Sequence, residues 1–208
     1  SAASDVYKRQ GLSAGAGVVI SQYFGGRRKE DMSKAVHSSI ALTALLSVVF
    51  TVAGMLFTKP LLRAIGVPEE VLPHSSLYLT IYFAGMTFSL FYNMGSGILR
   101  AVGDSRHPLI YLAVASLVNI ALDFLFVCGF HMGIAGVAIA TIIAQAVSSA
   151  MVMYKLMHTQ EDYKLELRKI HFHKKMVKKI IAFGFPAALQ QSITSSVSYT
   201  HLRAHETG

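Results

Sequence analysis

Charge is scarce in this sequence. Only 14% of the 208 residues are charged and 53% are hydrophobic, whereas about 25% of residues are charged in a typical soluble domain. A soluble domain of this length needs a charged shell to stay dispersed, while a chain embedded in a bilayer needs charge only in its loops. The composition therefore argues against a soluble enzyme or a disordered tail and favours a membrane protein.

Cysteine is almost absent as well, because Cys128 is the only one. It cannot form an internal disulfide or a two-thiol zinc or redox site, so we interpret it as a small buried apolar residue. The apolar segments contain no Ser–His–Asp or Cys–His arrangement, which is the pattern that nucleophilic catalysis requires. We therefore expect no enzymatic activity, no catalytic residue and no cofactor. His158, His171 and His173 are interpreted as part of a solvated basic face rather than as metal ligands.

What the sequence does contain is a series of uncharged runs long enough to cross about 30 Å of hydrocarbon, which takes roughly 20 helical residues. Four runs are complete, and only one of them includes a charged residue, Asp123; they cover residues 38–57, 77–99, 109–130 and 132–154. Two shorter runs, at 11–26 and 180–196, each adjoin a hydrophilic tail. Short connections with Gly and Pro separate the runs. The pattern predicts an all-α membrane protein built as an antiparallel bundle of transmembrane helices.

The basic residues lie almost entirely on one side of this predicted bundle. If the spans alternate in direction, one face collects the loops at 27–37, 100–108 and 155–179, which hold 14 Lys and Arg residues. The other face collects 58–76 and the turn near 129–133, which hold 2. By the positive-inside rule the first face is cytoplasmic. The net charge of +8 is therefore a topology signal rather than a sign of nucleic-acid binding, and 155–179 is predicted to link two bundles.

Asp123 is the most informative position, because an acidic residue at the centre of a membrane helix costs about 2.5–3.5 kcal/mol and should face a bundle interior or an aqueous cavity. Asn119 lies one helical turn earlier, on the same face, and its amide could donate to the carboxylate. Two roles stay open. The pair could simply hold helices together, or it could bind a proton or a cation such as Na⁺.

Two neighbouring spans offer further polar oxygens. Asn93 belongs to a seam of small and polar residues, spaced four apart, that includes Gly85 and Gly97. Such a seam lets another helix approach closely, but an amide of that size is better explained by a polar partner. Thr141 lies beside a second small-residue seam, although a membrane threonine usually bonds back to its own helix. The glycine-rich stretch 11–17 lacks the Lys-Ser/Thr ending of a phosphate loop, so close helix packing is favoured there.

The order of motifs along the chain resembles the multidrug and toxic compound extrusion (MATE) transporters, within a wider group that includes lipid-linked oligosaccharide flippases. The resemblance covers about residues 11–197. The matching pieces are Gln22-Tyr-Phe-Gly-Gly-Arg27, Ile98-Leu-Arg-Ala-Val-Gly-Asp-Ser-Arg-His-Pro108, Asn119-x-x-x-Asp123, Gly133-x-x-Gly-x-Ala-x-Ala-Thr141 and Gly184-Phe-Pro186.

That resemblance implies a fold of twelve helices in two six-helix lobes, of which this chain would supply helices two to six and the start of the seventh. Residues 11–154 would then form a partial N-terminal lobe, and 180–196 the start of the second lobe. In relatives, an acidic residue of the first helix joins an Asn and an Asp of the fifth in a proton- or sodium-responsive site. Asn119 and Asp123 match that pair, and Asn93 and Thr141 are additional candidates.

The resemblance also implies a function, a location and partners. It implies an antiporter coupled to H⁺ or Na⁺ that exports amphipathic or cationic small molecules across the inner (cytoplasmic) membrane as a multi-pass protein. Its partners would be the lipid bilayer, small-molecule substrates and the remainder of its own chain, with no nucleic acid. No substrate-binding residue is assigned. A lipid-linked oligosaccharide flippase, which should have a cationic cavity, and a non-transporting structural subunit are the alternatives.

The two ends of the sequence call for a separate explanation. Residues 1–10 and 197–208 resemble translated adapter sequence of the kind found at the ends of assembled metagenomic fragments. They interrupt two hydrophobic runs with polar residues that do not suit a loop. We therefore expect both tails to be non-native and to contribute nothing to fold or function.

Overall fold

The computed structural model describes residues 2–207, with side chains for 11–190 and 192–206. This part of the chain is almost entirely helical and contains no strand. The long helices are α1 (Ala2–Gly25), α2 (Lys29–Ala64), α3 (Leu72–Ala101), α4 (Arg106–Asp123), α5 (Ile134–His158) and α6 (Lys174–Thr207). A π-helix, η1 (Phe124–Gly129), continues α4, and a short 3₁₀ helix, η2 (Leu167–Lys169), lies in the loop before α6. The expectation of an all-α antiparallel bundle is confirmed.

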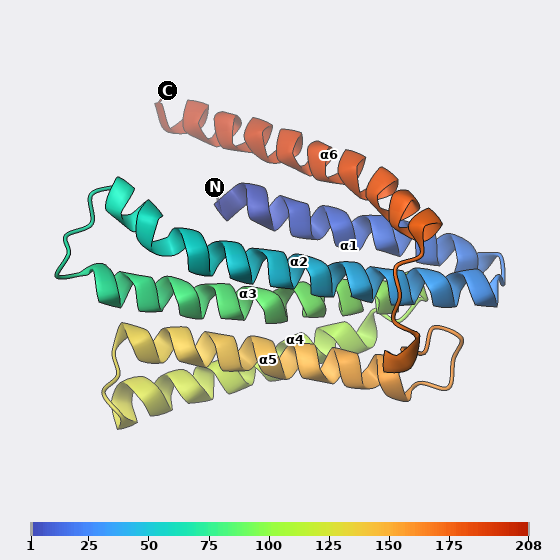
Figure 1. Ribbon diagram of the computed structural model, residues 1–208, viewed down its shortest axis with the longest axis horizontal. Helices are drawn as coiled ribbons and strands as arrows, with labels where there is room; N and C mark the ends of the chain where they lie inside the picture. Colours follow the sequence, from blue (N-terminus) through green and yellow to red (C-terminus); the bar gives the residue numbers. More distant parts are fainter. Residues whose placement is uncertain (1, 208) are drawn as a thin grey trace.

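Successive helices run in alternating directions, as the loop pattern predicts (Figure 1). The turn at 26–28, the turn at 102–105 and the loop at 159–173 gather at one end of the bundle. The α2–α3 and η1–α5 connections lie at the other end. An ion pair between Lys29 and Asp162, 3.6 Å apart, joins two of the three basic connections directly. The 14 Lys and Arg residues of segments 27–37, 100–108 and 155–179 therefore lie in these loops or in the helix turns next to them, at one end of the molecule.

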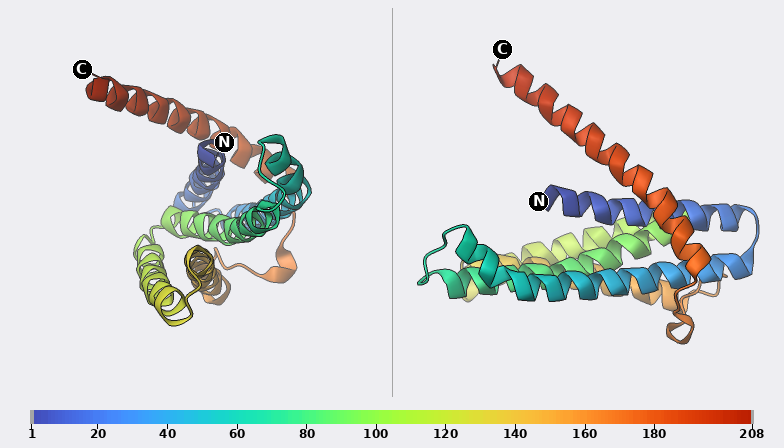
Figure 2. Two further views of the ribbon diagram at one scale, coloured as in Figure 1. Left: turned by 90° about the vertical axis from the view of Figure 1, so that its left-hand side faces the viewer. Right: turned by 45° about the horizontal axis from the view of Figure 1, so that its top comes forward.

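Helix α3 is the centre of the bundle. It packs against α1, α2 and α5, while α4 packs against α5 and α6 crosses α1 (Figure 2). Glycines allow the closest crossings: a Cβ on Gly15 would come within 2.6 Å of the backbone nitrogen of Gly184 in α6. A Cβ on Gly85 would come within 2.9 Å of Ile142 Cγ1 in α5. The interpretation of the glycine-rich stretch 11–17 as helix packing is thus confirmed.

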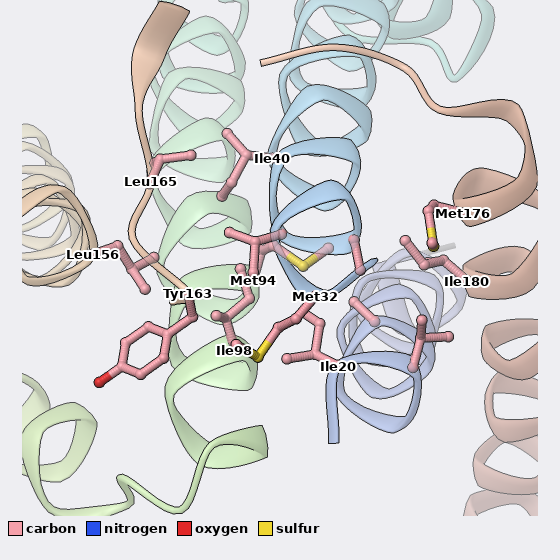
Figure 3. Close-up of a cluster of buried hydrophobic side chains, with 14 of the residues drawn as sticks. Ile20, Met32, Ile40, Met94, Ile98, Leu156, Tyr163, Leu165, Met176 and Ile180 are labelled. Carbon is pink, nitrogen blue, oxygen red and sulfur yellow. The ribbon is translucent and has the colours of Figure 1, made fainter. Parts of the chain in front are cut away.

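The apolar core lies toward the end of the bundle that carries the basic loops, and Figure 3 shows its side chains. It draws on five of the long helices and on the loop before α6, including Leu165, which is 1% exposed. Large aliphatic and thioether side chains from separate helices meet there; the labelled members are Ile20, Met32, Ile40, Met94, Ile98, Leu156, Tyr163, Leu165, Met176 and Ile180. Burial of such side chains typically contributes ~1.5–3 kcal/mol each, so this core anchors the loop as well as the helices.

The helices extend beyond the uncharged runs that predict them. α2 begins at Lys29 and continues through Pro60 to Ala64, whereas the uncharged run covers only 38–57. Pro60 leaves the carbonyl of Leu56 without its helical partner, and α2 bends near that end (Figure 1). The predicted linker 155–179 is helical at both ends, so the connection without α-helix is 159–173. Charged residues end a hydrophobic run but do not stop a helix, which is why hydropathy underestimates helix length.

The predicted tails are helical in the structure. The backbone of residues 2–10 belongs to α1, and residues 197–207 belong to α6. The tail boundaries at residues 10 and 197 therefore do not coincide with helix ends. Whether these segments are native stays a prediction, since helix formation says nothing about their origin. The side chains of residues 1–10 lie outside the described residues.

Three helical stretches of the described chain are long and apolar enough to cross a membrane: Lys29–Ala64, Arg106–Gly129 and Ile134–His158. α1, α3 and α6 are long enough, but none of their segments is apolar enough to join these three, so the predicted span 77–99 is not among them. The seam of small and polar residues in α3, which includes Gly85, Asn93 and Gly97, lowers the mean hydropathy of that helix. Helix Arg106–Gly129 is the least covered, because only 6% of its most apolar 18-residue window is buried inside the structure.

The topology can be tested by thiol labelling. We expect cysteines introduced at Arg27, Arg106 and Lys174 to be protected from an impermeant thiol reagent in intact cells, because their end of the bundle carries the Lys and Arg excess. Cysteines at Glu69 and His131, at the opposite end, should react. The background should be Cys128→Ala, since Cys128 is exposed and not buried as its isolation in the sequence suggested. Labelling of position 174 from outside would reverse the orientation.

Candidate functional site

Asp123 lies at the junction between α4 and the π-helix η1. π-turns inside helices are rare and occur frequently at functional sites, because the extra residue per turn re-aims neighbouring side chains. Gly136 of α5 faces this segment, and a Cβ on it would come within 3.0 Å of Phe126 Cβ. The glycine therefore lets α5 pack closely against η1. Asp123 itself is half-buried and lines an open groove of about 350 Å³ with Ile120 and Phe124.

The most unusual feature of α4 is a pair of buried oxygens with no hydrogen-bond partner. Within the described chain, neither Asn119 Oδ1 nor Asp123 Oδ1 accepts a hydrogen bond, and both are buried. The expected hydrogen bond from the Asn119 amide to the Asp123 carboxylate does not form; that expectation is wrong. One helical turn brings the two residues onto the same face but does not by itself orient the amide nitrogen toward the carboxylate.

Burying an oxygen without a hydrogen-bond partner lowers the stability of the fold. A buried acceptor left unsatisfied typically costs ~1–3 kcal/mol, and more when it is charged. In folded proteins most buried polar atoms have a partner, so an exception calls for an explanation such as a bound ion or a functional role. Asn119 and Asp123 together offer an amide oxygen and a carboxylate oxygen on one helix face. This donor set suits a proton or a hard cation.

Asn93 has the polar partner that its size suggested. Its Nδ2 donates to Ser89 Oγ at 3.4 Å, and its backbone carbonyl accepts from Ser13 Oγ of α1 at 2.9 Å. The side chain lines a groove of about 540 Å³ between α1 and α3, together with Ser13 and Arg100. Gly97 adjoins Ser13 so closely that a Cβ there would collide with the serine hydroxyl. The seam on α3 thus combines close packing with a polar site.

Thr141 donates its hydroxyl back to Val137 O at 3.0 Å, as expected for a membrane threonine. It lines a pocket of about 270 Å³ between α3 and α5. Tyr82, Met86 and Gln145 line the same pocket, so aromatic, thioether and amide groups converge there. The tyrosine and glutamine contributions could not be placed from sequence alone, because they depend on which faces α3 and α5 turn toward each other.

The four predicted site residues therefore do not form one contact cluster. Asn93, Asp123 and Thr141 line three separate hollows, and α4 packs mainly on α5. Ser89 connects two of these hollows, since it lines the α3–α5 pocket and accepts the hydrogen bond from Asn93. In the described part of the chain, no group of three or more His, Cys, Asp or Glu side chains could hold a metal ion.

A second polar pair, which the sequence argument did not single out, fixes the start of α4. Asp104 accepts from the His107 ring Nδ1 at 2.8 Å and from the His107 backbone N–H at 3.2 Å. Burial alone would raise the pKa of Asp104, but the His107 hydrogen bonds and the positive charges of His107 and Lys155 lower it below its ordinary value. Asp104 therefore favours its ionised form and holds the first turn of α4 through His107. The sequence signal for this pair was Asp104, an acidic residue three positions before His107, whose backbone N–H lies in the first helical turn and has no partner within the helix.

Comparison with known proteins gives consistent results. The family profile described as MatE matches residues 9–125. The chain is 31% identical over 192 residues to the probable multidrug resistance protein YoeA of Bacillus subtilis, covering 89% of this chain and 42% of that protein. It is 32% identical over 184 residues to the probable multidrug resistance protein YpnP of the same organism, covering 88% and 41%.

A similar solved structure is the inward-facing conformation of a multidrug resistance MATE family transporter, which superposes with a TM-score of 0.80 at 28% identity. The superposition covers 91% of this chain and 43% of that one. The chain thus spans less than half the length of the relatives that it matches.

Proposed function

Because this chain belongs to the MatE family of multidrug and toxic compound extrusion transporters, we propose that it forms part of an antiporter that exports amphipathic or cationic small molecules. The exchange ion is H⁺ or Na⁺, and the membrane is the cytoplasmic one. The single observation that carries the proposal is the pair of buried, unpartnered oxygens of Asn119 and Asp123 on a helix long and apolar enough to cross a bilayer. Ion-driven exchange requires such a site, whereas a passive structural helix does not.

The proposed coupling follows from the cost of an unpaired carboxylate in a medium of low dielectric constant. A proton on Asp123, or a cation shared by Asp123 Oδ1 and Asn119 Oδ1, removes that cost. Binding would favour the helix arrangement in which these oxygens lie together, and release would favour another. Differential binding of this kind is what shifts a two-state equilibrium. Two protein oxygens do not complete a cation's coordination, so the proposal assigns the rest to water or to other helices of a longer protein.

In this proposal Asn93 and Thr141 act indirectly and do not bind the ion in the described helix arrangement. Each lines a different hollow from the one that Asp123 lines, so each would join the coupling site in another helix arrangement. Ser89 offers a connection, because it joins the groove at Asn93 to the pocket at Thr141. We propose that these polar groups transmit the state of Asp123 to the substrate path.

The pocket between α3 and α5 supports the substrate class. Tyr78, Tyr82 and Met86 give it an adaptable apolar wall, and Ser89 and Gln145 supply polar groups. Of the described residues that line it, none is charged. A flippase for lipid-linked sugars would need cationic groups to hold its phosphate-bearing substrate, so the lining favours export of amphipathic molecules.

The transport assay tests the proposal in a full-length protein that contains residues 11–196. Purified protein in liposomes should drive efflux of a fluorescent organic cation when a proton or sodium gradient is imposed. Collapse of the gradient with the matching ionophore should stop it, because exchange needs the ion's free energy. Movement of a lipid-linked sugar without ion dependence would favour the flippase alternative. No movement of either substrate, by a protein with an intact fold, would favour a structural subunit.

A further inference from the structure

The loop between α5 and α6, residues 159–173, is held firmly against the bundle. Leu165 is 1% exposed and Tyr163 is 8% exposed, and both belong to the apolar core (Figure 3). The backbone N–H of Leu165 also donates to Leu156 O at 2.9 Å. This docked loop is the only covalent connection within the described chain between α5 and α6. Its position therefore influences how α6 meets the rest of the bundle.

His37 of α2 fastens the middle of this loop. Its Nε2 accepts the backbone N–H of Glu166 at 3.1 Å, and its Nδ1 lies 2.7 Å from Ser33 O. A carbonyl oxygen can only accept, so Nδ1 carries the hydrogen, and a backbone N–H can only donate, so Nε2 must be unprotonated. The two contacts together require neutral His37 in the Nδ1–H form. The side chain is only 2% exposed.

Ser38, the next residue of α2, fastens the end of the loop. Its hydroxyl accepts the backbone N–H of His173 at 3.2 Å and donates to His171 O at 3.4 Å. Consecutive residues of one helix therefore hold two separate parts of the loop. The two fastenings differ in one respect: the serine hydroxyl carries no titrating proton, whereas the histidine contact requires an unprotonated Nε2.

The charges around His37 would not compensate its protonation. Lys34 lies one turn away on α2, and His171 and His173 lie on the loop; burial, His171, Lys34 and His37 together lower the pKa of His173. Two nearby carboxylates have other partners: Glu30 lies 3.8 Å from Lys34 Nζ, and Glu166 lies 3.5 Å from Lys169 Nζ. Among the described residues no carboxylate pairs with His37. A proton on Nε2 would face the Glu166 N–H, donor against donor, in a buried site.

We propose that His37 is a proton-sensitive latch: neutral His37 holds the α5–α6 loop on α2, and protonation of its Nε2 releases the loop. The docked state binds one proton fewer at this site, so docking is strongest at higher pH and weakens as pH falls. The latch lies at the end of the bundle that carries the basic loops. Acidification of that compartment would therefore loosen the connection to α6 without involving Asp123.

A nitroxide spin label on the loop can test this latch. Leu167 is 61% exposed, so a label on Leu167→Cys, in a Cys128→Ala background, reports loop mobility without entering the core. The full-length protein is reconstituted in phosphatidylcholine nanodiscs, and its EPR spectrum is followed over the range in which histidine changes charge, about pH 8 to 5. The ratio of immobile to mobile label should fall roughly tenfold on acidification, the size expected for loss of a buried hydrogen bond.

Three variants distinguish the effect of His37 on loop mobility from that of other histidines. His37→Gln stays neutral and offers an oxygen to the Glu166 N–H, so the loop should remain immobile at both ends of the pH range. His37→Ala removes the acceptor, so the loop should be mobile throughout. His74→Gln, at the opposite end of the bundle, should behave like the wild type. If His37→Gln still showed the full increase in loop mobility on acidification, the proposal would be overturned. If only His173→Gln abolished that increase, the pH-sensitive residue would be His173 and the proposal would be wrong.

Discussion

Replacing Asp123 by Asn is expected to abolish ion-driven efflux while leaving the fold intact. The amide is neutral and cheaper to bury than a carboxylate, but it can neither take up a proton nor attract a cation at this site. The initial rate of gradient-driven efflux from liposomes should therefore fall by about tenfold or more, the size of a typical coupling free energy of 1–3 kcal/mol. Protein amount and melting temperature are measured alongside to separate coupling from folding.

The controls for Asp123 distinguish coupling from helix packing. Asp162→Asn makes the same chemical change in the exposed loop, where the carboxylate pairs with Lys29, and should leave transport unchanged. Asn119→Ala should weaken the ion response less than Asp123→Asn, because water can replace one of the two oxygens. Wild-type coupling in Asp123→Asn would mean that the Asn119–Asp123 pair only helps helices to pack.

Gly15→Ala is expected to separate α1 from α6 and to lower stability. The new methyl group would collide with Ile180 O and come within 2.6 Å of Gly184 N and 2.8 Å of Gly184 Cα. These are backbone atoms, which cannot move aside as the end of a flexible side chain can. Overpacking of this kind typically costs ~1–3 kcal/mol, so we expect the melting temperature in detergent to fall by roughly 2–10 °C.

Gly25→Ala is the matched control for Gly15→Ala. It adds the same methyl group to the same helix, but nothing lies within 4 Å of the position it would occupy. Its melting temperature should equal or slightly exceed that of the wild type, since alanine favours helix more than glycine does. Equal stability of the two variants would show that α1 and α6 do not pack through Gly15 and Gly184.

Much of the architecture was already determined by the sequence. The uncharged runs, the turn residues between them and the one-sided distribution of Lys and Arg predict helices, antiparallel neighbours and a shared basic end, and the structure has all three. The glycine-rich stretch 11–17 also predicted close helix packing correctly. These features are local: each depends on the hydropathy, size or charge of neighbouring residues, and a bilayer leaves helices few alternatives.

The candidate site could be predicted only in part. A lone Asp in an apolar run marks a position that must have a function or a partner, and that inference needs no coordinates. What the sequence could not supply was the rotation of each helix about its axis. This rotation left Asn119 Oδ1 and Asp123 Oδ1 unpaired and placed Asn93 and Thr141 in other hollows.

The latch at His37 depended entirely on the tertiary structure. Sequence places His37 and Glu166 129 positions apart, and nothing local to either indicates that one should accept a hydrogen bond from the other. Their meeting requires α2 and the α5–α6 loop to reach the same end of the bundle, with Leu165 buried beside Leu156. The sequence alone thus predicted the order and the alternating direction of the helices, because hydropathy and charge act locally. Only tertiary packing decided which polar groups meet, because hydrogen bonds depend on relative helix positions and rotations to within a fraction of an ångström.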